Sequence, residues 1–147
     1  MAAWGAGSFE NDAASDWAAD LADGGDLEMV RAALETAARC PADEHLESDE
    51  GAEALAAAEV VAAAMGRPVK SIAMGTSGPH AIAWGRSHGA AGKADLVELA
   101  LEAVDRVDAA ASELQEQWSA EESTGAGAGS REWFSEVEDL RNRLLAG

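Results

Sequence analysis

Three aspartates near the start of the chain have the spacing to act together on a cation. Asp12, Asp16 and Asp20 recur at every fourth residue, which places them on one face of an α-helix. Like charges at this spacing repel one another by about 0.2–0.5 kcal/mol per pair. The aspartates are therefore candidate residues for binding a cation or a cationic partner. The alternative is a solvated face, in which Asp12 or Asp16 bonds back to the preceding residues.

Two glutamates further along the chain are candidates for buried carboxylates. Glu53 and Glu59 share an alanine-rich stretch with Leu55, Val60 and Val61, and its small side chains would let neighbouring helices approach closely. A buried carboxylate needs either a partner or a raised pKa. Both glutamates are thus candidate binding residues, unless they lie on the polar side of an amphipathic helix.

Paired acids also invite comparison with metal-dependent enzymes. Glu50-x-x-Glu53 and Glu102-x-x-Asp105 resemble the acid pairs of all-α nucleoside triphosphate pyrophosphatases, which implies a metal-dependent hydrolase as an alternative function. The 48 residues between Glu53 and Glu102 are more than we expect for that family, and acidic helices produce such pairs by chance.

No cofactor site and no catalytic residue is predicted. Gly89–Lys93 superficially resembles a phosphate-binding loop, but Ala94 occupies the position at which such a loop carries serine or threonine. His80 and His88 have no cysteine or carboxylate nearby, and His45 among carboxylates is more typical of a surface residue than of a metal ligand.

Charge is distributed unevenly along the chain. The 147 residues carry 28 acidic and 10 basic side chains, a net charge of −18. Residues 1–66 and 94–147 are strongly acidic, whereas 67–93 contain four basic residues and no acid. Such a field repels nucleic acid and anionic membranes and attracts a cationic partner. The alternative is that the acidity only keeps an alanine-rich protein soluble.

These features favour a protein-binding module, such as an inhibitor or immunity-type protein that covers a basic partner. A structural subunit that dimerises through alanine-rich faces is a further possibility, so we expect a monomer or a homodimer.

The elements that must position these residues are helices. Apolar residues recur at intervals of three and four, and no stretch alternates with the period of a strand. Helices are expected over 12–22, from Asp26 to residue 38, over 48–65 and over 94–110. Ser112 begins either a new helix through a capping box or a continuation of the preceding one, and Ser130 caps a last helix over 130–147. The sequence predicts an all-α, single-domain bundle of five or six helices.

Three segments are expected to be irregular. Residues 1–10 form a glycine-rich aromatic arm that should fold onto the helices. Residues 66–93 form an irregular basic segment, a packed lid over the acidic helices that is anchored by Ile82 and by Trp84, a further candidate binding residue. Residues 123–129 form a flexible linker.

One opening motif also carries a family resemblance. Trp4-Gly5-x-Gly7-x-Phe9-x-Asn11-Asp12-x-x-x-Asp16-Trp17 resembles the start of the bacterial domain-of-unknown-function family 4259. The likeness continues at Glu53–Pro68, at Ser112–Trp118 and at the helix around Trp133. The family implies a fold but no activity, so the resemblance leaves function open.

Cysteine content and hydropathy bear on location. A lone cysteine, Cys40, excludes an intrachain disulfide and suits a reducing compartment. No leader sequence and no run of about 20 apolar residues is present. We therefore expect a soluble, cytoplasmic protein.

Overall fold

The protein is an all-α helical bundle. We describe it from a computed structural model that covers residues 12–41, 43–65, 83–84, 94–109, 112–116 and 127–145, with the side chains of 12, 94 and 127–132 set aside. Its helices are α1 (Asp12–Ala22), α2 (Leu27–Ala38), α3 (Ser48–Ala64), α5 (Ala94–Val107) and α7 (Gly127–Leu145). No strand occurs among the residues described, where one isolated parallel bridge joins Leu46 to Ser112. The predicted fold class is confirmed.

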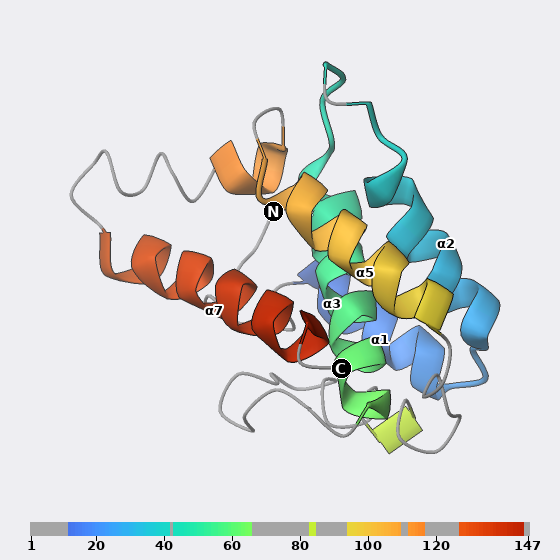
Figure 1. The fold of residues 1–147 in the computed structure, drawn as a ribbon. Helices are drawn as coiled ribbons and strands as arrows, with labels where there is room; N and C mark the ends of the chain where they lie inside the picture. The colour runs from blue at the N-terminus through green and yellow to red at the C-terminus, as the bar shows by residue number, and fades with distance from the viewer. Residues whose placement is uncertain are drawn as a thin grey trace.

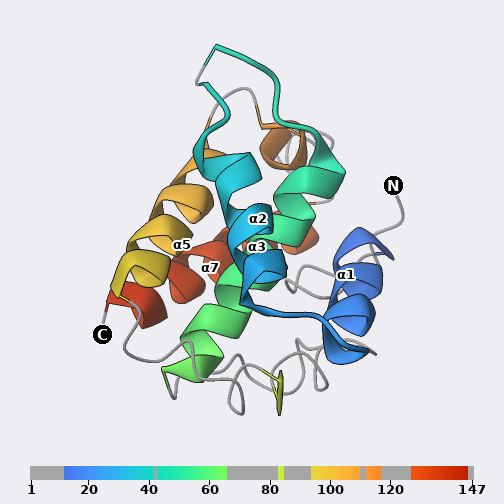
Figure 2. The same ribbon diagram turned by 90° about the vertical axis from the view of Figure 1, so that its right-hand side faces the viewer.

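α3 is the central helix. It packs against each of the other four helices, and α2 and α5 also pack on one another (Figures 1 and 2). Buried positions follow one another without a break from Ala54 to Ala63, so α3 has no solvent-facing side over this length. Its alanines leave room for neighbouring backbones, which explains how so many helices converge on it. None of the helices in the described residues has both the length and the apolar character to cross a membrane.

Local signals set the boundaries of α1 and α2. Gly24 has a φ of 108°, a left-handed conformation that glycine adopts without strain, and α1 ends just before it. The carboxylate of Asp26 accepts a hydrogen bond of 3.1 Å from the backbone N–H of Met29. Asp26 is therefore the N-cap of α2, as the sequence predicts.

A buried arginine supports the loop that follows α2. Arg106 of α5 is 8% exposed, and its guanidinium donates to the carbonyl oxygens of Cys40, Pro41 and Glu44 at 3.0, 3.1 and 2.6 Å. These carbonyls lie past the helix end, where backbone acceptors lack helical partners. The buried Arg106 side chain thus links α5 to the loop at the end of α2.

The start of α3 is capped from a distant part of the chain. The backbone N–H of Ser48 donates to the Glu113 carboxylate at 2.8 Å, and the backbone N–H of Glu113 donates to the Leu46 carbonyl at 2.8 Å. Hydrogen bonding to the backbone N–H of Ser48, and then to its side chain, lowers the pKa of Glu113. A carboxylate at this position also faces the positive end of the helix dipole.

Two expectations about the second half of the chain can be compared with the structure. α5 ends at Val107, and a separate helical turn over 113–116 begins after Ser112, whose hydroxyl accepts a hydrogen bond from the backbone N–H of Gln115 at 3.4 Å. The alternative of one continuous helix is wrong.

α7 begins at Gly127 rather than after Ser130, so the last three residues of the expected linker are helical. Glycine disfavours helix by only about 1 kcal/mol relative to alanine, which is too little to prevent one additional turn. The arm at 1–10 lies outside the described residues, as do residues 66–93 apart from Ala83 and Trp84.

Candidate acidic binding site

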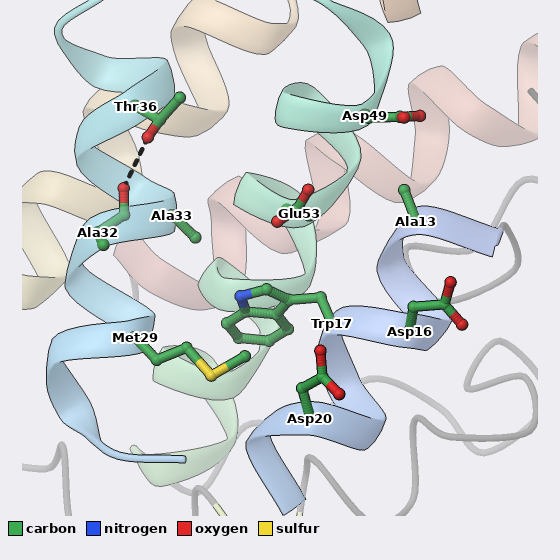
Figure 3. Close-up of a pocket in the computed structure, with 10 residues that line it drawn as sticks. All are labelled: Ala13, Asp16, Trp17, Asp20, Met29, Ala32, Ala33, Thr36, Asp49 and Glu53. Carbon is green, nitrogen blue, oxygen red and sulfur yellow. Dashed lines mark hydrogen bonds between the residues drawn. The ribbon is translucent and has the colours of Figure 1, made fainter.

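A hollow of about 570 Å³ opens between α1, α2 and α3. Four carboxylates belong to its lining, together with an indole, a thioether, three alanine side chains and a hydroxyl (Figure 3). The lining residues are Ala13, Asp16, Trp17, Asp20, Met29, Ala32, Ala33, Thr36, Asp49 and Glu53. We call this feature the acidic hollow. Its volume lies within the roughly 300–1,000 Å³ that is usual for ligand pockets.

Helical spacing places the four carboxylates in two pairs. Asp16 and Asp20 lie one turn apart on α1, and Asp49 and Glu53 lie one turn apart on α3. Each pair stands on a helix rather than on a loop, and α1 packs directly on α3. The two walls of the acidic hollow are therefore held in a fixed relation.

Part of the lining of the acidic hollow is apolar. Trp17 is 6% exposed and belongs to the hydrophobic core, and its ring extends from α1 toward Met29 of α2 (Figure 3). Thr36 donates its hydroxyl proton to the Ala32 carbonyl at 2.9 Å, which leaves its oxygen as an acceptor. The lining of the acidic hollow thus combines hydrogen-bond acceptors with apolar surface.

Glu53 is the carboxylate most affected by this environment. It is half-buried, and burial raises its pKa, with further contributions from the negative charges of Asp49 and Glu50. A second hollow of about 190 Å³, lined by Ala33, Thr36, Glu50 and Glu53, adjoins it. The ionised form of Glu53 is thus less stable than in water, and a nearby cation would stabilise it.

The arginines whose side chains are described lie elsewhere. Arg31 bonds to Asp95, Arg39 to Glu35, Arg106 to the loop carbonyls, Arg141 to Asp105 and Asp108, and Arg143 to Glu59 and Asp139. None of them lines the acidic hollow. Within the described part of the chain, its negative charge is not offset by a lining cation.

The structure brings together three of the residues singled out in the sequence, namely Asp16, Asp20 and Glu53. Asp12 is the first residue of α1, and its side chain lies outside the description. Asp49 was missed, although its position four residues before Glu53 on the same helix would have identified it as a neighbour.

Glu59 and Trp84 lie apart from the acidic hollow. Glu59 has no solvent exposure and accepts hydrogen bonds from Arg143 at 2.7 and 3.2 Å. Trp84 is 8% exposed and belongs to the hydrophobic core. Neither lines the acidic hollow.

The acid pairs of the enzyme hypothesis do not form a metal centre in the part of the chain that is described. No three histidine, cysteine, aspartate or glutamate side chains gather there in a way that could hold a metal ion. Glu53 faces the acidic hollow, whereas Asp105 on α5 bonds to Arg141 at 2.7 Å. His45 contacts a carboxylate of Glu116 at 3.1 Å.

Neither a curated protein nor a solved structure gives a significant match to the chain. A family model does match, over residues 2–130, and its description is a domain of unknown function, DUF4259. The match spans most of the chain, including α1, α2, α3 and α5. The chain therefore belongs to the DUF4259 family.

Proposed function

We propose that the protein is a binding module whose acidic hollow receives arginine or lysine side chains from a basic segment of a protein partner. The observation that carries this proposal is a hollow lined by four carboxylates, with no cation among the lining residues that the structure describes. A charged guanidinium or ammonium group would be attracted to it over a distance of about one Debye length, roughly 10 Å at 0.1 M salt.

The mixed lining favours these side chains over a bare metal ion. Arginine and lysine carry a charged head on an apolar stem. The carboxylates of Asp16, Asp20 and Glu53 would accept hydrogen bonds from the head, and Trp17 with Met29 would contact the stem. The planar guanidinium of arginine can also donate two parallel hydrogen bonds to one carboxylate. We therefore expect arginine to bind more tightly than lysine.

The net charge of the chain acts in the same direction. A net charge of −18 speeds association with a cationic partner, and added salt weakens this attraction. When a fixed number of carboxylates is neutralised by mutation, this general attraction does not depend on which ones are changed. Specific binding at the acidic hollow does.

This difference defines the test. Binding of a fluorescent hexaarginine peptide would be measured by anisotropy for the wild-type protein and for a hollow variant, D16N/D20N/D49N/E53Q. A control variant, D43N/E98Q/E102Q/E138Q, changes the net charge equally at exposed positions outside the acidic hollow. Circular dichroism establishes that each variant is folded.

We expect the hollow variant to lose at least about tenfold in affinity, equivalent to about 1.4 kcal/mol, and the control variant to lose much less. Equal losses in the two variants would show that the peptide responds only to overall charge, and would refute binding at the acidic hollow. Hexalysine in place of hexaarginine should bind more weakly to the wild-type protein but show the same order among the variants.

A further inference from the structure

The indole N–H of Trp17 is a buried hydrogen-bond donor at the acidic hollow. Trp17 is 6% exposed and lines the hollow, and its nitrogen lies on the side of the ring toward Glu53 and Ala33 in Figure 3. An indole nitrogen can donate a hydrogen bond but cannot accept one. Buried tryptophans usually place this N–H against an acceptor, because a buried donor without one is costly.

This donor has no acceptor among the residues that the structure describes. Thr36, the one hydroxyl in the lining, is bonded to the Ala32 carbonyl on its own helix. The half-buried carboxylate of Glu53 likewise accepts no hydrogen bond within the described part of the chain. The lining therefore presents both a donor and acceptors to whatever occupies the acidic hollow.

These two kinds of group define the ligand more closely than charge does. A ligand that satisfies both needs a cation for the carboxylates and an acceptor for the indole N–H. The acceptor has to be neutral, because the four carboxylates of the lining would repel a second anion. Metal ions and fully protonated polyamines carry no such acceptor, whereas every residue of a peptide carries a carbonyl oxygen.

We propose that the acidic hollow recognises an arginine residue together with its peptide backbone. The guanidinium bonds to the carboxylates, and a main-chain carbonyl beside that residue accepts a hydrogen bond from the indole N–H of Trp17. This inference rests on the proposed function and narrows it, from a cationic side chain to a cation joined to an amide. Trp17 is then the residue that selects peptides over simple cations.

The expected size of the selection follows from the burial of the donor. An ordinary hydrogen bond changes an equilibrium by about two- to tenfold once the lost bonds to water are counted. The carboxylates respond to the charge alone, so they bind a guanidinium with or without an amide. The contribution of Trp17 should therefore appear as a difference between two ligands of equal charge.

The test compares N-acetylagmatine with heptylguanidinium. Both carry one positive charge on an alkyl chain of similar length, but only N-acetylagmatine has a carbonyl. Each is titrated into the ¹⁵N-labelled wild-type protein and into Trp17→Phe, which keeps an aromatic ring and removes the donor. Dissociation constants come from the backbone amide shifts of α1 and α3. Trp17→Phe should weaken N-acetylagmatine about two- to tenfold more than heptylguanidinium, since lost packing affects both ligands.

A second measurement uses the wild-type protein alone, so it does not depend on the folding of Trp17→Phe. The indole proton of Trp17 should move downfield and exchange with water more slowly when N-acetylagmatine is bound. Heptylguanidinium at saturation should leave the exchange rate of this proton higher, because it supplies no acceptor.

The outcomes separate this inference from the proposed function. Equal weakening of the two ligands by Trp17→Phe, or an indole proton that responds alike to both, would show that water or Glu53 already serves the donor, and would overturn the inference. The proposed function survives that result as long as the hollow variant binds both ligands more weakly than the charge-matched control variant does. Equal binding by these two variants would refute the proposed function and this inference with it.

Discussion

The guanidinium of Arg143 lies 2.7 Å from the carboxylate of Glu59, 84 positions earlier in the chain, and Glu59 has no exposed surface. Removing one member of such a pair leaves an uncompensated buried charge. We predict that Arg143→Ala lowers the free energy of unfolding in urea by about 3–5 kcal/mol. The matched control is Arg39→Ala, which breaks an exposed ion pair with Glu35 and should cost less than about 1 kcal/mol.

Replacing both members of the buried pair is a different experiment. Glu59→Met combined with Arg143→Leu removes both charges and keeps apolar volume, so the double variant should be at least as stable as the wild-type protein, or within about 1 kcal/mol of it. A double variant as unstable as Arg143→Ala would mean that packing, and not the unpaired charge, dominates the loss.

Trp17 has a structural role as well as a place in the acidic hollow. Because it is 6% exposed and packs in the core, Trp17→Ala should cost about 3–5 kcal/mol in urea denaturation. Leu145, which is 62% exposed, gives the control, and Leu145→Ala should change stability by about 0.5 kcal/mol or less. A cost below about 1 kcal/mol for Trp17→Ala would reassign the indole from core to binding surface.

Glu53 should make stability fall as pH rises through a defined window. Its pKa is raised above the ordinary 4.5, so between pH 4.5 and the raised value the folded state holds a proton that the unfolded chain has lost. The free energy of unfolding therefore decreases with pH in this window. Glu53→Gln should remove that slope and raise stability at neutral pH, by less than about 1 kcal/mol because water screens the half-exposed group.

The same ionisation should control ligand binding. A cation favours the charged form of Glu53, so hexaarginine affinity should fall as pH decreases through the raised pKa.

The stability measurement has its own contradicting outcome. If the free energy of unfolding of Glu53→Gln changes with pH as steeply as that of the wild-type protein, other carboxylates account for the pH dependence.

Glu113 should produce the opposite dependence at lower pH. Its pKa is lowered by the hydrogen bonds with Ser48, so its contribution to stability is fully present above pH 4.5 and is lost as pH falls below that value through the folded pKa. Glu113→Gln should therefore show a shallower loss of stability in acid than the wild-type protein. Glu98→Gln, on the exposed side of α5, serves as the control and should retain the wild-type slope.

Local signals were sufficient to predict most of the helices. Asp26 before α2 and Gly24–Gly25 after α1 act within one or two turns, and the bounds of α1 agree with those expected from the sequence. The glycines before Ser130 are the exception, because their weak preference against helix does not prevent α7 from including them. Here the structure extends α7 by three residues.

The candidate site was predicted only in part, for a physical reason. The spacing of Asp16 and Asp20 shows that they share a face, but no local rule indicates that Glu53 lies across from them, since that depends on how α1 packs on α3. The same holds for Glu59 and Arg143, and for Glu113 and Ser48, which are 84 and 65 residues apart. Such pairs are set by the tertiary arrangement, so composition and periodicity do not reveal them.

An NMR titration of the ¹⁵N-labelled protein with hexaarginine tests the central claim most directly, because it locates the ligand residue by residue. Saturable shifts should concentrate on Asp16, Asp20, Asp49 and Glu53 and on the indole N–H of Trp17, which together line the acidic hollow. Shifts of similar size on the exposed carboxylates of α5, such as Glu98 and Glu102, or no saturable shift at the acidic hollow, would contradict the proposal that this site receives a cationic partner.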